Sequence, residues 1–187
     1  MIKFGGIRMN LTVQKINSSF KDLEKLEVLN QEAFPDEERM TIQEMIDLAE
    51  KKELDLWALY DNQQFIGFYA LVMKKPVGYI LFFAISPDHR SKGYGGEALV
   101  LMKKRYSDCQ IVLDMEPVEN AATNLQQRVS RKKFYLRNGF YETGYFMGYK
   151  GLKMEVLCNQ SSFRKTEFEA LLKNLKIREI PFQLWKK

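Results

Sequence analysis

The sequence predicts one α/β domain in which a mixed β-sheet carries helices on both faces. Along the chain, the apolar residues change between helical spacing and strand spacing. Three strand-like segments follow one another and then alternate with helices, a pattern typical of a mixed sheet covered by helices. The composition, 45% hydrophobic and 28% charged residues in a chain of 187, is ordinary for a protein that buries one core.

The first strand and helix are predicted near the N-terminus. Leu11 to Ile16 alternates apolar and polar side chains, as an edge strand does. Ser19, with Asp22 three residues later, predicts the cap of a helix. That helix should end at Pro35, because the residue before a proline disfavours helical geometry.

A second helix and three strands are predicted next. Thr41 and Glu44 have the capping-box spacing that begins a helix. Period-two and continuous apolar runs then predict three strands. The predicted strands are Leu54 to Tyr60, Phe65 to Met73 and Gly78 to Ser86, with Asp61 to Gln64 as a hairpin turn.

Strands and helices are expected to alternate in the remaining chain. No linker-like composition divides it, so we expect one domain over 9–158 and a helix–strand extension over 159–187. The extension either packs on the domain or joins two subunits of a homodimer. The predicted segments are a helix from Gly96 to Tyr106, a strand from Gln110 to Met115, a helix from Ala122 to Arg137, strands from Phe140 to Tyr149 and Leu152 to Leu157, a tail helix from Arg164 to Lys176, and a last strand from Ile177 to Trp185.

The composition argues against a metal centre, a disulfide and a membrane span. The one histidine, His89, excludes a multi-histidine metal site, and Cys109 and Cys158 should be buried free thiols. The longest apolar run, Val77 to Ile85, is far shorter than the roughly 20 residues of a membrane helix. Without a signal-like N-terminus, the protein is expected in the cytoplasm. The net charge of +5 suits an anionic ligand, and the basic residues are too scattered to favour nucleic acid.

The most informative segment is a glycine-rich turn, Arg90-Ser91-Lys92-Gly93-Tyr94-Gly95-Gly96, between a buried strand and a helix. The first turn of a helix presents N–H groups without intrahelical partners, at the positive end of the helix dipole. Glycines let the backbone approach a phosphate closely, and Arg90 and Lys92 add positive charge. The turn therefore predicts an anion site suited to a pyrophosphate.

Other glycine-rich patterns fit this turn less well. A Walker loop needs Lys and Ser or Thr after its last glycine, but Gly96 is followed by Glu97 and Ala98. A Rossmann turn needs a glycine where Ala98 stands. A structural interpretation remains, in which the glycines only let the helix pack tightly on the strand.

The turn resembles the cofactor motif of the GNAT acetyltransferase superfamily, Gln/Arg-x-x-Gly-x-Gly/Ala, here Arg90-x-x-Gly93-x-Gly95. The preceding Ile85-Ser86-Pro87 matches the Val/Ile-x-Pro ending of the family's strand. A second segment, Phe-Tyr-Leu-Arg-Asn-Gly-Phe at 134–140, is similar to the family's Tyr-x-x-x-Gly-Phe. The family's element order also agrees with the one predicted from Leu11 to Leu157.

The resemblance implies a GNAT-like fold, with a mixed, largely antiparallel central sheet that splays in a V, and acetyl-CoA as acetyl donor without a metal. The pyrophosphate would bind the N–H groups of Lys92 to Gly96. The pantetheine arm would pair like an added strand with backbone near Ala84 and Ile85. The splay would lie between the strands at Tyr79 to Ser86 and Gln110 to Met115.

The resemblance also names a candidate for the leaving group, Tyr135. A phenol with a pKa near ~10 stays protonated at neutral pH and can donate to a thiolate with a pKa of roughly 8.5. Helical spacing places Arg128, Arg131 and Tyr135 on one polar face, although a core role for the tyrosine remains open. Many family members have Asn and Ala at the two arginine positions. These arginines would therefore contact the cofactor's phosphates, an acidic acceptor or only solvent.

Two carboxylates are candidate general bases. Glu116 follows the strand that ends at Met115, and Glu32 lies near the end of the first helix. Some family members use a chain of water molecules instead. The acidic run at 36–38 falls in a loop that borders the acceptor site in this architecture, where it would attract a cationic amine or remain solvated.

These features favour an N-acetyltransferase that moves acetyl from acetyl-CoA to a primary amine of an unidentified acceptor. One alternative is a non-catalytic acyl-CoA sensor or assembly module of the same fold. A basic nucleic-acid binder is the least favoured hypothesis, and no membrane partner is expected.

Overall fold

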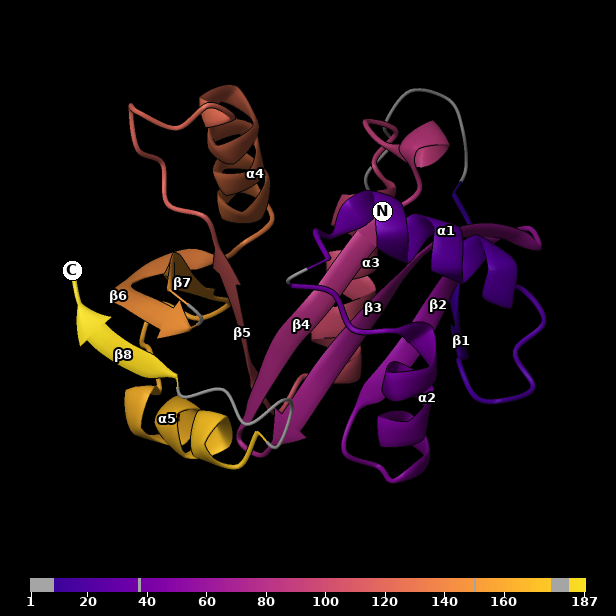
Figure 1. The fold of residues 1–187 in the computed structure, drawn as a ribbon, viewed down its shortest axis with the longest axis horizontal. Helices are drawn as coiled ribbons and strands as arrows, with labels where there is room; N and C mark the ends of the chain where they lie inside the picture. The colour runs from indigo at the N-terminus through magenta and orange to yellow at the C-terminus, as the bar shows by residue number, and fades with distance from the viewer. Residues whose placement is uncertain (1–8, 37, 150, 176–181) are drawn as a thin grey trace. The chain divides into compact units, whose positions relative to one another are not determined.

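The computed structural model describes residues 9–36, 38–149, 151–175 and 182–187 (Figure 1). Its strands form one sheet in the order β1-β2-β3-β4-β5-β7-β6-β8. The elements are β1 (Leu11–Lys15), α1 (Leu23–Ala33), α2 (Ile42–Glu50), β2 (Asp55–Asp61), β3 (Gln64–Lys74), β4 (Val77–Ile85), the 3-10 turn η1 (Pro87–His89), α3 (Tyr94–Arg105), β5 (Gln110–Met115), α4 (Leu125–Arg137), β6 (Tyr141–Tyr149), β7 (Leu152–Cys158), α5 (Lys165–Lys173) and β8 (Gln183–Lys186).

The sheet is mixed and mostly antiparallel, as predicted. Among the strand pairs whose register is described, only β4 with β5 is parallel. That parallel ladder joins Val77–Tyr79 to Gln110–Val112, while β4 continues to Ile85. The V-shaped splay beyond this ladder remains a prediction. In the described part of the chain, no helix is both long and apolar enough to cross a membrane.

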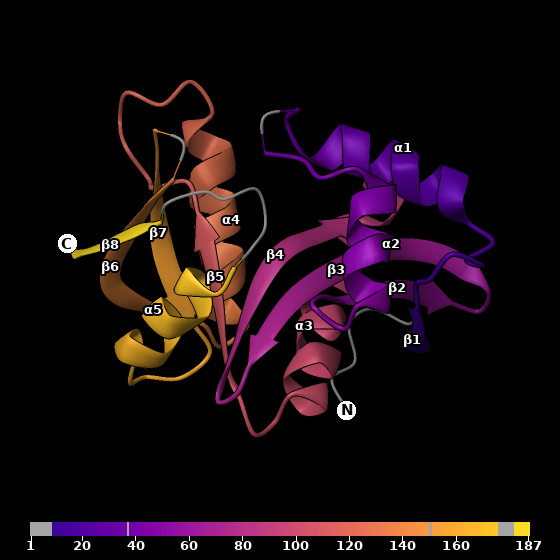
Figure 2. The ribbon, with the colours of Figure 1, turned by 60° about the horizontal axis from the view of Figure 1, so that its bottom comes forward.

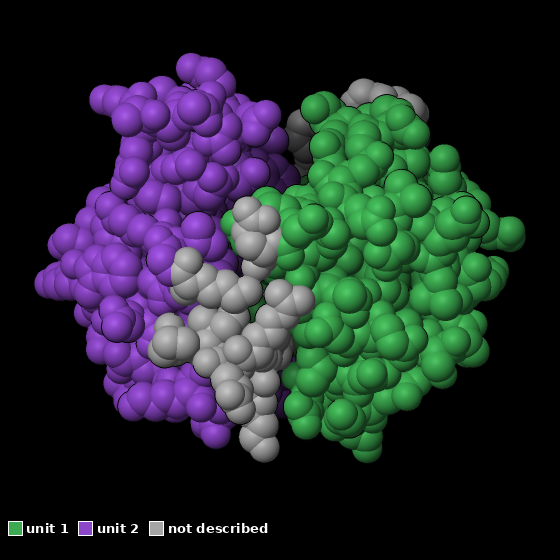
Figure 3. All heavy atoms as spheres, viewed as in Figure 1, with its two compact units in different colours: residues 1–72, 81–101 green, residues 73–80, 102–187 purple. Residues whose placement is uncertain are grey.

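The chain divides into two compact units, which Figure 3 colours separately. Unit 1 comprises residues 1–72 and 81–101, and unit 2 comprises residues 73–80 and 102–187. Their boundary passes through β4 and α3. The predicted division into 9–158 and 159–187 concerns a different boundary and remains a prediction.

Unit 1 is a sheet segment with helices on both faces. The helices α1 and α2 cover one face of β2, β3 and β4, and α3 begins on the other face (Figures 1 and 2). The ring of Phe34, after α1, packs edge-on against Phe82 of β4 and Phe68 of β3, with centroid distances of 5.0 and 6.3 Å. These aromatic contacts fix the start of the loop between α1 and α2 against the strand that leads into the glycine-rich turn.

Unit 2 contains the C-terminal strands with α4 and α5. In Figure 2, α4 lies behind these strands and α5 in front of them. The Phe168 ring of α5 packs edge-on against Tyr79 of β4 at 5.4 Å, so the tail helix belongs to the core of this unit. Cys109 and Cys158 are buried and free, which confirms that prediction.

Helix α4 is held mainly by charged groups, because none of its residues is fully buried. Lys132 forms ion pairs with Glu142 of β6 and with Glu155 of β7, whose carboxylate lies 2.9 Å from the Lys132 Nζ. Glu155 is almost fully buried and also pairs with Lys187 at 3.2 Å. The ion pairs of Lys132 connect α4 to the strands β6 and β7.

The predicted cap at Ser19 is wrong. The Asn17 side chain accepts hydrogen bonds from the Ser19 N–H and hydroxyl at 3.0 and 2.8 Å, which closes a local turn and takes Ser19 away from the helix. Helix α1 therefore begins at Leu23, after Asp22. The Asp22 carboxylate instead accepts a hydrogen bond from the Tyr60 hydroxyl at 2.6 Å.

Other predicted boundaries shift by a few residues. The capping box of Thr41 and Glu44 is confirmed, with the Thr41 hydroxyl accepting from the Glu44 N–H at 3.2 Å. Helix α4 begins at Leu125 rather than Ala122, because Thr123 and Asn124 form a turn before it. Helix α3 begins two residues before the predicted Gly96. The tail helix ends at Lys173, and the predicted continuations at 176–181 lie outside the described residues.

Gly67 of β3 lies in close contact with β4. A Cβ atom at this position would be 2.2 Å from the carbonyl oxygen of Ala84, a distance that no side chain can adopt. The neighbouring Ser86 N–H donates to the Ile66 carbonyl at 2.9 Å and holds the two strands together at this point. Glycine at position 67 thus sets the course of β4 just before the glycine-rich turn.

We expect Gly67→Ala to lower the free energy of unfolding by about 3 kcal/mol, because the new methyl group must displace backbone. Gly144→Ala is the matched control. Its Cβ would meet no atom within 4 Å, but its φ of 76° costs an L-residue about 1 kcal/mol. Urea denaturation measures both losses, and equal losses would contradict the close contact at Gly67.

Candidate functional site

The glycine-rich turn in unit 1 has the geometry of an anion site. Ser91 and Gly93 have left-handed backbone conformations, with φ of 59° and 94°. The first hydrogen bond of α3 runs from the Glu97 N–H to the Gly93 carbonyl at 3.1 Å. The N–H groups from Tyr94 to Gly96 precede that bond and have no acceptor within the helix. Three backbone donors are thus gathered at the positive end of a helix of 12 residues, as a pyrophosphate requires.

Cationic side chains surround this turn. Arg90 and Lys92 are exposed, and Ser91 between them is exposed as well. The Arg90 Nε donates to the Ile85 carbonyl at 3.0 Å, which ties the end of β4 to the turn and leaves the guanidinium charge beside it. These contacts agree with a site that binds a phosphorylated ligand through backbone N–H groups and positive charge.

The backbone predicted to contact pantetheine is already partly engaged within unit 1. The Ala84 carbonyl faces Gly67, and the Ile85 carbonyl accepts from Arg90. A pantetheine arm that paired with this strand would have to use the remaining lone pairs of these carbonyls or the backbone N–H groups. The assignment of Ala84 and Ile85 to the pantetheine arm remains a prediction.

The Tyr94 side chain is hydrogen-bonded within unit 1. Its hydroxyl donates to the Asp61 carboxylate at the end of β2, with an O–O distance of 2.7 Å. This hydrogen bond raises the pKa of Tyr94 above its ordinary value. Sequence reasoning assigned Tyr94 to the cofactor and missed Asp61. The available signal was an acidic residue directly after an apolar strand, a pattern that usually marks a solvated turn.

The candidate leaving-group residue, Tyr135, lies in α4 of unit 2. Its ring packs edge-on against Phe134 and Phe140, with centroid distances of 5.2 and 5.7 Å. Tyr135 keeps part of its surface exposed, yet the surrounding protein desolvates the phenol and raises its pKa to about 12. The positive charge of Arg131 lowers the pKa and the negative charge of Asp114 raises it, but desolvation is the largest cause.

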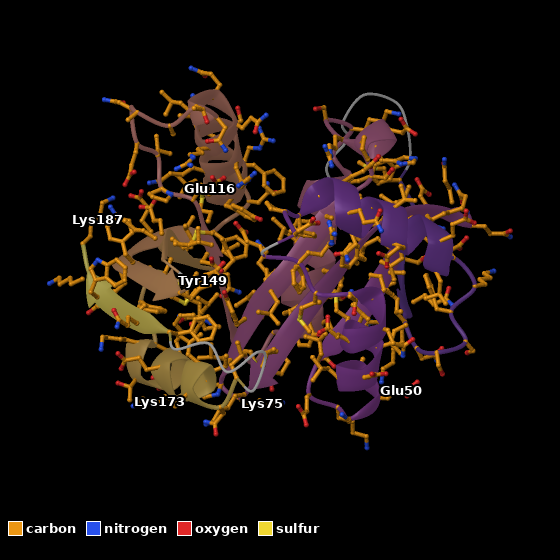
Figure 4. The ribbon with its side chains drawn as sticks, viewed as in Figure 1. Glu50, Lys75, Glu116, Tyr149, Lys173 and Lys187 are labelled. Carbon is orange, nitrogen blue, oxygen red and sulfur yellow. The ribbon has the colours of Figure 1, made fainter. Side chains whose placement is uncertain are left out.

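Glu116, which Figure 4 labels, forms ion pairs with the two arginines that precede Tyr135 on α4. Its carboxylate oxygens lie 2.8 Å from Arg128 Nη2 and 3.0 Å from Arg131 Nη1. Arg128 also donates to the Asn124 side chain at 2.6 Å and the Pro117 carbonyl at 3.0 Å, so its donors are used within unit 2. Arg131 is 45% exposed, and of the two arginines it is better placed to meet an anion from solution.

A further polar pair, Tyr79 and Asp114, was missed by sequence reasoning. The Tyr79 hydroxyl of β4 donates to the Asp114 carboxylate of β5 at 2.5 Å. The same carboxylate acts on the pKa of Tyr135. Asp114 could have been noticed because it is the acidic residue inside an otherwise apolar strand. The structure thus brings Asp114, Glu116, Arg131 and Tyr135 into one charged cluster of unit 2.

The other acidic candidates lie in unit 1. Glu32 is exposed on the last turn of α1. Asp36 is exposed and forms an ion pair with Arg39, whose guanidinium also donates to the Phe34 carbonyl at 3.3 Å. Glu37 lies outside the described residues.

The fold and the anion-binding turn define an acetyltransferase-like class of protein, and comparison with known proteins identifies the family. A sequence model of the acetyltransferase (GNAT) family matches residues 20–140, well over half of the chain. The chain therefore belongs to the GNAT family of acetyltransferases, as its two motifs predicted. No curated protein sequence matches the chain.

Solved structures of this family share the fold. An acetyltransferase of the GNAT family from Bacteroides thetaiotaomicron has a TM-score of 0.71 at 23% identity, over 89% of this chain and 97% of its own. One from Elizabethkingia anophelis, solved with acetyl-CoA bound, has a TM-score of 0.53 at 17% identity, over 80% and 97%. Arabidopsis thaliana Naa50, in complex with a bisubstrate analogue, has a TM-score of 0.56 at 20% identity, over 80% and 98%.

We expect Gly93→Ala to raise the dissociation constant for acetyl-CoA about tenfold. An alanine is strained by 1–2 kcal/mol at this left-handed φ, and relief of the strain would turn the N–H groups of the α3 start away. Calorimetric titration measures the effect.

Gly151→Ala is the matched control for this variant. Its φ of 77° imposes the same backbone strain on an alanine. The new Cβ would meet no atom within 4 Å, and the residue belongs to the turn between β6 and β7. Equal affinities for Gly93→Ala and the wild-type protein would contradict the assignment of this turn.

Proposed function

We propose that this protein transfers an acetyl group from acetyl-CoA to a primary amine. The observation that carries the proposal is the start of α3, where three backbone N–H groups without helical acceptors lie beside Arg90 and Lys92. A diphosphate offers the complementary charge and several acceptor oxygens. The GNAT relative from Elizabethkingia anophelis was solved with acetyl-CoA bound, which supports the same donor here.

The pKa of Tyr135 decides what this residue can do for the departing thiolate. Complete proton transfer from a phenol of pKa about 12 to a thiolate with a pKa of roughly 8.5 is uphill by about 5 kcal/mol. A hydrogen bond from the phenol to the thiolate needs no such transfer and still stabilises the developing charge. We therefore assign Tyr135 as a hydrogen-bond donor that stays protonated throughout the neutral and moderately alkaline range.

Glu116 remains the first candidate for the general base, and Glu32 the second. A base must take the proton of the attacking amine, but the Glu116 carboxylate also holds Arg128 and Arg131. Protonation of Glu116 would weaken both ion pairs. A role as the base would therefore loosen the attachment of α4 to Glu116. The same constraint favours one alternative function, an acyl-CoA sensor of this fold that binds the thioester without turnover.

The acceptor is proposed to be an amine of a small molecule or a polypeptide. Naa50 was solved with a bisubstrate analogue of CoA and a peptide, and another neighbour is an aminoglycoside 6′-N-acetyltransferase complexed with coenzyme A. We place the reaction in the cytoplasm, because two buried free thiols suit a reducing compartment. Homodimer formation through the C-terminal extension also remains a proposal.

The direct test is acetyl-CoA binding by calorimetry, followed by thiol release in the presence of a polyamine, an aminoglycoside, free amino acids and short peptides. We expect micromolar binding and thiol release with at least one amine. Binding without release from any amine supports the sensor, and absence of binding contradicts both functions.

Once an acceptor is found, we expect Tyr135→Phe to lower kcat about 100-fold, because one donor to a developing negative charge is lost. The affinity for acetyl-CoA should stay within about twofold. Tyr141→Phe is the control, since Tyr141 is an exposed tyrosine of the same unit. The activity of the wild-type enzyme should show no alkaline loss from Tyr135 below about pH 11, because its phenol stays protonated up to its raised pKa.

If Glu116 is the base, Glu116→Gln should lower kcat by 100-fold or more, remove the acidic limb of the pH–rate profile and leave acetyl-CoA affinity unchanged. Glu142→Gln is the control, because it removes a carboxylate that pairs with Lys132 of the same helix. An unchanged pH profile would remove Glu116 as the base and leave it as the residue that anchors Arg128 and Arg131.

A further inference from the structure

One carboxylate in unit 1 is buried and has no part in the proposed reaction. Asp61, the last residue of β2, keeps only 7% of its surface exposed. It accepts the Tyr94 hydroxyl at 2.7 Å on one oxygen and the Asn10 N–H at 3.3 Å on the other. A buried carboxylate is costly unless hydrogen bonds compensate it, so this arrangement needs an explanation.

The position of Tyr94 supplies that explanation. Tyr94 is the first residue of α3, and its own N–H is among the donors that precede the first helical hydrogen bond. Its ring is buried and packs edge-on against His89 of η1 at 5.7 Å. The residue therefore reaches inward with its side chain while its backbone faces the anion site.

Asp61 also binds the segment before β1, and that segment lies against the turn at Gly93. Asn10, whose N–H binds Asp61, follows Met9, and the Met9 Cε lies 3.0 Å from where a Cβ of Gly93 would be. Leu11 then pairs with Asp61 in the ladder of β1 and β2. Asp61 thus connects the start of β1, the end of β2 and the first residue of α3.

We propose that Asp61 and Tyr94 are positioning residues that hold the first turn of α3 in the orientation that binds the diphosphate of acetyl-CoA. The inference rests on the proposed function, since it concerns the same anion site. Left-handed residues 91 and 93 give the turn its shape. The Tyr94–Asp61 hydrogen bond ties the first residue of α3 to the end of β2, so the N–H groups are oriented before the ligand arrives and less ordering is needed on binding.

The test is Tyr94→Phe, which deletes one hydroxyl and leaves the ring in place. We expect the dissociation constant for acetyl-CoA to rise about tenfold in calorimetry, and the effect in turnover to appear in KM rather than kcat. Binding of S-acetylpantetheine, which lacks the diphosphate, should be equal in the variant and the wild-type protein when followed by ligand-observed NMR.

Tyr60→Phe is the matched control. Tyr60 is buried in the same unit, and its hydroxyl donates to the Asp22 carboxylate at 2.6 Å, away from the glycine-rich turn. Both variants lose one tyrosine–carboxylate bond, so both should lower Tm, but only Tyr94→Phe should weaken acetyl-CoA binding. In hydrogen exchange, the Glu97 N–H, which donates to the Gly93 carbonyl, should exchange faster in Tyr94→Phe alone.

Three results have distinct meanings. Equal acetyl-CoA affinity in Tyr94→Phe and the wild-type protein overturns the inference while leaving the proposed function intact. Equal weakening by Tyr60→Phe also overturns it, because a general loss of stability would then explain the effect. No binding of acetyl-CoA by the wild-type protein removes the proposed function itself. If Tyr94→Phe does not fold, Asp61→Ala tests the same bond, since it removes both acceptor oxygens.

Discussion

The structure of the candidate site depends on one constraint: the first N–H groups of α3 must face outward together. At many helix starts a side-chain cap occupies these N–H groups, which leaves fewer donors for a ligand. Here two left-handed residues, Ser91 and Gly93, bend the backbone sharply before Tyr94 begins the helix. Asp61 then holds the Tyr94 side chain from inside the unit. The close contact of Gly67 with Ala84 fixes the strand that delivers the chain to this bend.

The groups that would do the chemistry belong to the other compact unit. Tyr135 and Glu116 lie in unit 2, and β4 is the strand that both units share. Helix α4 has no fully buried residue and is attached by ion pairs from Lys132 and Arg128. These ion pairs place basic side chains along the helix. Desolvation of Tyr135 on such a helix keeps its phenol protonated, which suits a donor of hydrogen bonds better than an acid that must release its proton.

Arg128 and Arg131 of α4 have different environments. Arg128 is committed to Glu116, Asn124 and Pro117, whereas Arg131 holds Glu116 with one nitrogen and stays partly exposed. Glu116 offsets one of these two guanidinium charges, and Asp114, whose negative charge also acts on Tyr135, offsets the other. The charged cluster of unit 2 is therefore close to balanced.

The sequence by itself determined the order of the elements and the glycine-rich turn, because these follow from apolar periodicity and from local backbone rules. The Thr41–Glu44 capping box is local in the same sense, since its two partners are three residues apart. Only the tertiary structure decided the roles of Asp61 and Asp114, whose tyrosine partners are 33 and 35 residues away in the chain. It also decided that Ser19 is no helix cap, because Asn17 competes for its donors. A carboxylate looks the same in the sequence whether water or a distant hydroxyl binds it, and folding alone brings that hydroxyl within reach.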